Sequence, residues 1–225
     1  MNKYINIFDL IIISAVLFGP AVCSSIQARK ISSVESADVC EFSKRENVYA
    51  LITQAVQLFA AMLYLKFRGV NPFQFEFHIT GAAVLYALIL FSVCGLAMDF
   101  ITSMKYGFKW IPELLQHNTP ILGALQDVDL PLALVSILNG FYEEFFFLIV
   151  WSYVEPKYST VALILMFGIR VMIHTYQGFS TALAVGIGLG LIHYLLFTQF
   201  SDNLFIYVLS HIIADLFGIS FINLI

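Results

Sequence analysis

Four side chains that can exchange protons lie inside long apolar stretches of this sequence. They are Glu143, His174, His211 and Asp215. An ionisable group at membrane depth is costly, so by default it marks either a functional site or a buried pairing. A buried glutamate can take a proton from water, a histidine can orient that water, and a His–Asp pair can stabilise the oxyanion that forms. These residue types make hydrolysis the first hypothesis.

Spacing indicates which of the polar groups face each other. His211 and Asp215 are four residues apart, which puts them on one face of a helix. Glu143 and Glu144 are adjacent and point about 100° apart, so only one of them can face a shared centre. We expect the other carboxylate to hold a neighbour such as Arg170, and we treat Glu144 and Arg170 as supporting residues.

The same groups leave other chemistry open. Two or three His and carboxylate ligands with an open position are typical of catalytic zinc. A divalent metal, zinc first, is therefore a candidate cofactor, with Glu143, His174, His211 and Asp215 as candidate ligands. Ion or proton transport also uses Glu, Asp and His within the membrane. The simplest alternative is that these groups only join helices by hydrogen bonds.

Composition places these residues in a membrane protein. Of the 225 residues, 60% are hydrophobic and 12% are charged, and the mean hydropathy is +0.87. An ordinary soluble domain is about 45–50% apolar and about 25% charged. A soluble globule of this size cannot hide so much apolar surface. This composition excludes a secreted disulfide scaffold, a disordered regulator and a nucleic-acid binder. The net charge is −4, and no basic cluster exceeds two residues, so no phosphate-binding stripe is present and no nucleic-acid partner is expected.

The apolar residues fall into runs that can span a bilayer. A spanning helix needs about 20 mostly apolar residues. We expect an all-α polytopic membrane protein with about seven transmembrane helices (six to eight) and a single transmembrane domain over residues 1–225. The runs cover about residues 8–23, 48–65, 79–101, 131–154, 160–174, 179–197 and 204–225. Between them we expect a solvated loop over 24–47 and a short interfacial helix near Trp110.

Depth along these helices groups the candidate residues. At a rise of about 1.5 Å per residue, the four candidates lie about 11–21 Å below the same membrane surface, near the bilayer middle. His193 comes out shallower, at about 6–8 Å, and we expect it to lie outside the site. The glycines Gly186, Gly188 and Gly190 beside it predict close helix packing. Asp99 falls near the opposite surface and is also expected outside the site.

Three motifs in order resemble those of the CPBP intramembrane proteases, a family that includes CAAX prenyl endopeptidases and bacterial Abi or bacteriocin-processing proteins. The motifs are Glu143-Glu144, the string Phe167-Gly-Ile-Arg170-Val-Met-Ile-His174, and His211-Ile-Ile-Ala-Asp215. The resemblance covers residues 131–217, which form the last four helices. It implies a membrane-embedded active site built from those helices.

The resemblance also implies a role for each residue. Glu143 would act as general base on water, and His174 would help to position that water. His211 and Asp215 would stabilise the oxyanion or complete a metal site, with Glu144 in support. Two positions depart from the family pattern: its Arg after the Glu pair falls at Leu148, and its usual Asn is Asp215. Arg170 could supply the missing charge, and the departures also fit a chain that kept the fold and lost protease activity.

Three functions follow from these residues and the resemblance. The first is an intramembrane endopeptidase that cleaves a peptide or membrane-protein substrate. The second is a non-catalytic membrane regulator or immunity protein of the same fold that binds a membrane sensor or transporter. The third is an ion or proton transporter. In each case we expect an integral membrane protein in contact with the lipid bilayer, and the resemblance implies the bacterial cytoplasmic membrane.

Overall fold

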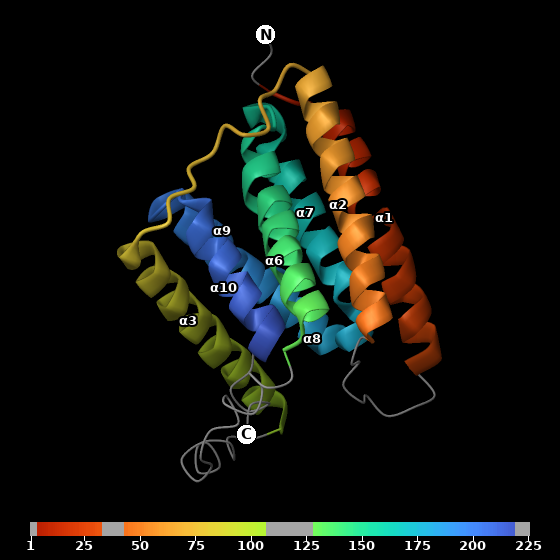
Figure 1. The fold of residues 1–225 in the computed structure, drawn as a ribbon, viewed down its shortest axis with the longest axis vertical. Helices are drawn as coiled ribbons and strands as arrows, with labels where there is room; N and C mark the ends of the chain where they lie inside the picture. The colour runs from red at the N-terminus through yellow and green to blue at the C-terminus, as the bar shows by residue number, and fades with distance from the viewer. Residues whose placement is uncertain (1–3, 33–42, 107–127, 219–225) are drawn as a thin grey trace.

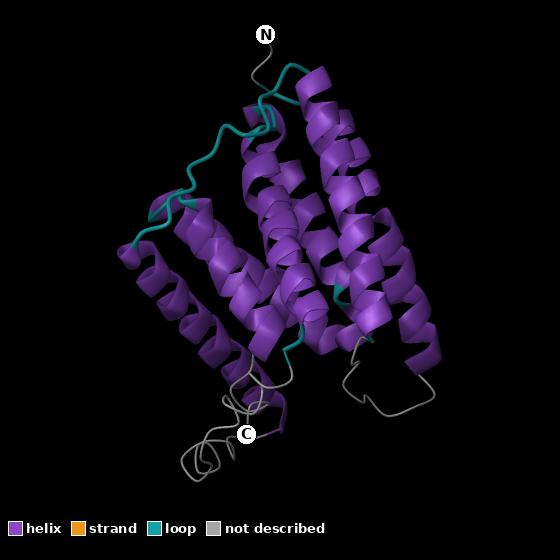
Figure 2. Ribbon diagram, viewed as in Figure 1, coloured by secondary structure: helices purple, strands orange, loops and turns teal. Residues whose placement is uncertain are grey.

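The computed structural model describes residues 4–32, 43–106 and 128–218, and it confirms the all-α polytopic membrane architecture. Helices run roughly side by side, and within the described residues the only β-type pairings are two isolated bridges (Figures 1 and 2). Six helical segments of the described chain are long and apolar enough to cross a membrane. The elements are α1 (Ile7–Ser32), α2 (Lys44–Phe67), α3 (Gly81–Tyr106), α6 (Leu130–Glu144), η1 (Phe145–Val150), η2 (Pro156–Tyr158), α7 (Ser159–Ile173), η3 (Thr175–Gln177), α8 (Phe179–Leu183), η4 (Ala184–Leu189), α9 (Gly190–Gln199) and α10 (Leu204–Phe217).

The helix boundaries differ from the expected ones at both ends of the chain. α1 continues to Ser32, so the polar connection before α2 is shorter than predicted. α10 has 14 residues and is a shorter apolar helix. The expected interfacial helix near Trp110 lies outside the described residues. Apolar content determines which part of a helix can lie in lipid, whereas caps and hydrogen bonds determine where the helix ends. The ends of the apolar runs therefore differ from the ends of the helices.

Capping residues fix the starts of two helices that carry polar site residues. Ser43 and Glu46 form a capping box at the start of α2. Asp129 caps α6 by accepting from the backbone N–H of Leu132 at 2.9 Å, and this hydrogen bond lowers the pKa of the Asp129 carboxyl. Lys44 adds an ion pair to Asp129 at 3.3 Å, so the starts of α2 and α6 lie at the same end of the bundle.

α6 is the central helix of the bundle. It packs between α2 and α10, while α10 also packs against α3, and α7 packs against α1 (Figure 1). The helix α6 continues directly into η1, whose six residues, including three consecutive phenylalanines, are all buried. Helix α1 contributes fully buried Leu10 and Leu17 to the same core. α6 therefore brings residues from several helices within reach of its polar side chains.

Glycines allow two close helix contacts. A Cβ on Gly186 would lie 2.6 Å from the backbone N of Val171, so η4 and α7 touch backbone to backbone there. A Cβ on Gly140 would lie 2.9 Å from Ile212 Cγ1 and 3.1 Å from the carbonyl O of Val208, where α6 crosses α10. The predicted glycine packing is confirmed at Gly186, and the α6–α10 contact lies one turn from the Glu pair.

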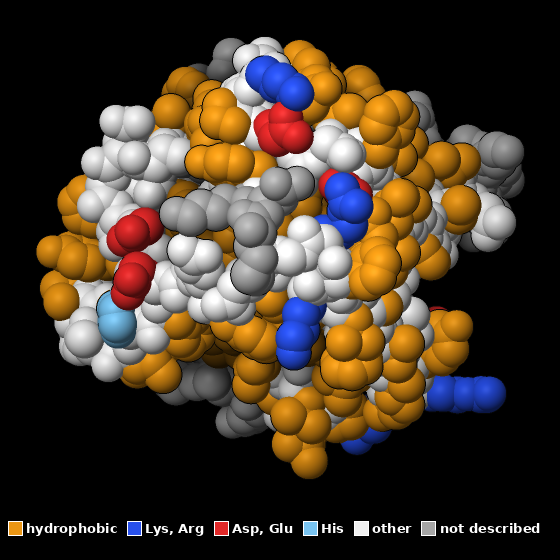
Figure 3. Space-filling model, turned by 90° about the horizontal axis from the view of Figure 1, so that it is seen from above, with side chains coloured by type: hydrophobic (Ala, Val, Ile, Leu, Met, Phe, Trp, Pro, Cys, Tyr) orange, Lys and Arg blue, Asp and Glu red, His pale blue; other side chains and the backbone are white. Residues whose placement is uncertain are grey.

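The end of the bundle where α1 begins is polar, with hydrophobic side chains around its rim (Figure 3). Asp9 is buried there and accepts from Tyr64 Oη at 2.8 Å. Arg68 pairs with both of its oxygens, with Nε 2.9 Å from Oδ1 and Nη2 3.1 Å from Oδ2. A charged end cap above an apolar belt is the surface expected of a protein that crosses a bilayer.

Candidate active site

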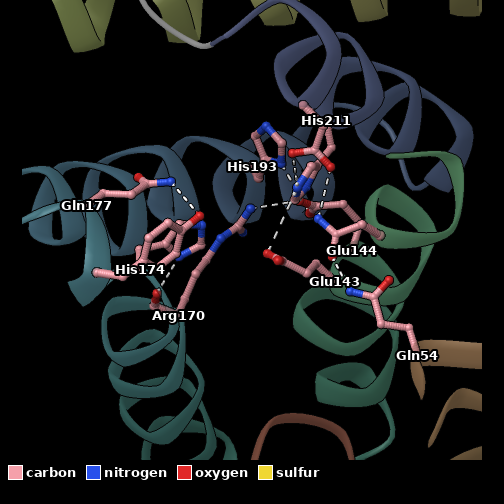
Figure 4. A network of polar contacts seen from close by, with 11 residues as sticks. Gln54, Glu143, Glu144, Arg170, His174, Gln177, His193 and His211 are labelled. Atoms are coloured by element: carbon pink, nitrogen blue, oxygen red, sulfur yellow. Dashed lines mark hydrogen bonds and ion pairs between the residues drawn. The ribbon is translucent and has the colours of Figure 1, made fainter. Parts of the chain in front are cut away.

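Glu144 is the centre of a buried cluster of charged side chains (Figure 4). Its Oε1 accepts from Arg170 Nη2 and from His211 Nδ1, each at 2.7 Å. Its Oε2 lies 3.1 Å from His193 Nδ1, at angles that are not those of a hydrogen bond. The side chain of Glu144 is 0% exposed and that of Arg170 is 4% exposed. The cluster therefore joins α6, α7, α9 and α10 around one carboxylate.

Glu143 faces a different space from its neighbour. Its Oε2 is buried and has no hydrogen-bond partner among the described residues. The same oxygen lies 4.0 Å from Nε2 of His211, and in Figure 4 the carboxylate points from α6 toward the side where Arg170 and His174 lie. The two glutamates thus divide as their 100° separation predicts: Glu144 holds Arg170, and Glu143 is left with an unsatisfied acceptor.

His211 connects the two glutamates to Asp215. Its Nδ1 donates to the Glu144 carboxylate, because a carboxylate offers only acceptors to it. Its Nε2 then faces Oε2 of Glu143 and also Oδ1 of Asp215, which lies 3.6 Å away. The Asp215 side chain is 29% exposed, against 10% for His211. Nε2 is therefore the nitrogen available for chemistry, and Asp215 is the outermost member of the group.

His174 is fixed at the end of α7. Its Nδ1 is 2.7 Å from the carbonyl O of Arg170, and a carbonyl only accepts, so Nδ1 carries the proton in this bond. The Nε2 of His174 is then the free acceptor of the neutral ring. The described link from His174 to the cluster runs through Arg170, whose backbone holds the imidazole and whose guanidinium holds Glu144.

The prediction that His193 lies outside the site is wrong, since it contacts Glu144 at the centre of the cluster. The depth estimate failed because it measured from the edges of apolar runs. Counted from the actual helix ends, His193 lies six residues before Gln199 and His211 seven residues after Leu204, so both are at the same level. Asp99, also expected outside, is fully buried in α3.

Arg170 lies close to Leu148, where the family pattern has Arg. The two side chains line one small crevice together with Phe147, and the guanidinium lies 4.9 Å from the centroid of the Phe147 ring. An arginine one turn after Glu144 on the same helix and an arginine on the neighbouring helix can thus reach the same carboxylate. In this chain Glu144 receives its positive charge from α7.

Two amide residues of the site are missing from the sequence-based set. Asn139 Nδ2 donates to Asp215 Oδ2 at 2.9 Å, and Gln54 Nε2 donates to Asn139 Oδ1 at 2.8 Å. Uncharged amides are tolerated in apolar helices. The energetic cost that marks a buried charged residue as unusual therefore does not mark these two. The available signal was the spacing of Asn139, which precedes Glu143 by one helical turn and so shares its face.

The backbone around the Glu pair is irregular. Regular α-helix ends at Glu144, and the next six residues form the π-helical segment η1. A second π-helical segment, η4, lies in the helix that carries His193. π-helical turns within α-helices are rare and occur frequently at functional sites, because the wider turn re-aims the side chains beside it. η1 directly follows Glu144, and η4 directly precedes α9, which carries His193, so each irregular segment adjoins a helix of the Glu144 cluster.

The arrangement of these side chains does not match a preformed zinc site. In the part of the chain that the structure describes, no three His, Cys, Asp or Glu side chains are grouped closely enough to hold a metal ion. Glu144 and Nδ1 of His211 are already engaged with each other. The predicted zinc therefore stays a prediction.

No family model, curated protein or solved structure matches this chain. The likeness to CPBP proteases consequently depends on the three sequence motifs alone.

Proposed function

We propose that this protein is an intramembrane peptide hydrolase of the CPBP type, with Glu143 as the general base. One observation carries the proposal: Oε2 of Glu143 is buried, has no hydrogen-bond partner among the described residues, and lies 4.0 Å from His211 Nε2. Burying an acceptor without a partner is unfavourable, so such a group is found where a ligand or water completes it. A water beside an unpaired buried carboxylate is the reactant that hydrolysis requires.

The proposed reaction uses the chain's own groups. Glu143 takes a proton from water while the water oxygen bonds to the carbonyl carbon of the scissile peptide. His211 donates from Nε2 to the oxyanion that forms, and Asp215 on the same helix face supports the positive imidazolium. The C–N bond then breaks, and Glu143 returns its proton to the departing amine. General-base catalysis of this kind contributes about 10²–10⁴-fold.

The Glu144 cluster serves as the frame for this reaction. Glu144 holds His211 through Nδ1 and so directs Nε2 toward Glu143. Arg170 compensates the charge of Glu144 and positions His174 through its backbone carbonyl. Arg170 on α7 supplies the positive charge that the family's arginine supplies beside the Glu pair. This favours an active protease over a chain that kept the fold and lost activity.

The proposal is tested by comparing peptide termini in bacteria that express the chain and its variants. Wild type should generate membrane-protein or peptide termini that are absent with Glu143→Gln at equal expression. The matched control is Glu76→Gln, which changes an exposed glutamate that pairs with His78 far from the cluster in sequence. If Glu143→Gln produced the same termini as wild type, the general base would be wrong. If no variant changed any terminus while a cellular phenotype persisted, the chain would be the non-catalytic membrane partner.

A further inference from the structure

Two amide side chains lead from the lipid-facing helix α2 to the edge of the candidate site. Gln54 is on α2, Asn139 on α6 and Asp215 on α10, and hydrogen bonds of 2.8 and 2.9 Å join them in that order. In Figure 4, Gln54 lies at the α2 end of a network that reaches His211. The three residues connect the helices on both sides of α6.

The direction of these hydrogen bonds is set at Asp215. Its carboxylate only accepts, so Asn139 presents its Nδ2 to Asp215 and its Oδ1 to Nε2 of Gln54. The reverse orientation of Asn139 would place its oxygen against a carboxylate. By donating to that Oδ1, Gln54 favours the same orientation of the Asn139 amide.

Asp215 needs such a constraint. It is two residues before Phe217, the last residue of α10, and its side chain is the most exposed of those around His211. Without a partner the Asp215 carboxylate would sample other rotamers, because a partly exposed side chain is less constrained by its neighbours. With Oδ2 held by Asn139, Oδ1 stays 3.6 Å from Nε2 of His211.

We infer that Gln54 and Asn139 are positioning residues, an amide relay that fixes the Asp215 carboxylate beside His211. The catalytic consequence rests on the proposed function, whereas the relay itself does not. Asn139 acts on Asp215 directly and Gln54 acts through Asn139, so the two ends of the relay are coupled although they do not touch.

A double-mutant cycle tests the relay without any activity assay. Gln54→Glu replaces the donor by an acceptor. The oxygen of the Asn139 amide must then face a carboxylate, either at position 54 or at Asp215. Asp215→Asn adds a donor, and the amide of Asn139 can then turn to satisfy both new partners. The double variant should therefore recover about 2–4 °C of the melting temperature lost in Gln54→Glu, the scale of one hydrogen-bond network in a chain of this size.

The matched control is Gln57, one turn along α2. Its Oε1 lies 3.1 Å from Tyr142 Oη, which also donates to the carbonyl O of Leu17, so Gln57→Glu makes the same chemical change on the same helix at a side chain bonded to Tyr142 and not to the relay. Gln57→Glu combined with Asp215→Asn should show additive shifts. If the Gln54→Glu and Asp215→Asn shifts also add without recovery, the relay is overturned.

A kinetic measurement then tests positioning on a substrate cleaved by wild type. Asn139→Leu should lower kcat by up to about 10²-fold with KM nearly unchanged, as a misplaced catalytic group does. An unchanged kcat would overturn the catalytic consequence. The two failures are distinguishable: loss of coupling in the cycle removes the relay, whereas full cleavage by Glu143→Gln removes the proposed function and leaves the coupling intact.

Discussion

Glu143 and Glu144 are adjacent in the chain, yet their carboxylates have opposite surroundings. Glu144 is completely buried and is contacted by an arginine and two histidines. Glu143 has an oxygen without a partner among the described residues. Oε1 of Glu144 is held by Arg170 and His211, so this carboxylate is less available as a base than that of Glu143. At the residue scale this contrast supports the proposal in which Glu144 has the structural part and Glu143 the chemical part.

Asp215 distinguishes hydrogen bonding from metal binding. An amide at this position can still accept from Asn139 and adds an N–H toward the oxyanion. We therefore expect Asp215→Asn to keep most activity and Asp215→Ala to lose about 10²-fold, the scale of one oxyanion contact. The measurement is peptide cleavage by both variants with and without added zinc.

The opposite pattern would indicate a metal. Asn is a far poorer zinc ligand than Asp, so Asp215→Asn would then cost nearly as much as Asp215→Ala, and chelators would inhibit wild type. Full activity in Asp215→Ala would contradict both versions and return this residue to a structural part.

Arg170 should be a main determinant of stability. Arg170→Met leaves the Glu144 charge buried with less compensation, and removing one partner of a buried pair costs about 3–5 kcal/mol. Thermal unfolding should show a large fall in melting temperature. The control is Lys157→Met, which removes an exposed partner of Glu155 and should change little. Equal effects of the two substitutions would contradict the buried cluster.

At the element scale, close helix crossings keep the polar groups together. Gly186 touches the backbone of α7 at Val171, and Gly140 touches α10 beside Val208 and Ile212. η4 leads into the helix with His193, and α6 carries the Glu pair. Spacing these helices further apart would separate the cluster, so small residues at the crossings are a condition for the site.

Substitution of one glycine tests this dependence. Gly186→Ala places a methyl group 2.6 Å from the backbone N of Val171, where only backbone movement can make room. Overpacking of this kind costs about 1–3 kcal/mol. Gly188→Ala is the matched control, because its methyl would meet only Ile101 Cδ1 at an ordinary 3.6 Å. Melting temperatures should fall for Gly186→Ala and stay near wild type for Gly188→Ala.

At the scale of the whole molecule, the sequence predicts the architecture better than the site. Long apolar runs define the helices, and the 100° offset between adjacent residues predicts that one glutamate of the pair holds Arg170. His193 was misplaced because its level depends on true helix ends and on π-helical turns, which hydropathy does not encode. Gln54 and Asn139 are 85 residues apart, and their contact depends on how α2 packs on α6, a tertiary property that no local pattern carries.

The central claim is hydrolysis by water that Glu143 activates, and oxygen-isotope incorporation tests it most directly. Purified protein in lipid nanodiscs would be incubated in ¹⁸O-labelled water with a peptide that carries a cleavage site found in cells. Wild type should place one ¹⁸O in the new C-terminal carboxylate, and Glu143→Gln should reduce that product by about 10²-fold or more. Equal labelled product from wild type and Glu143→Gln, or products without ¹⁸O, would contradict the account.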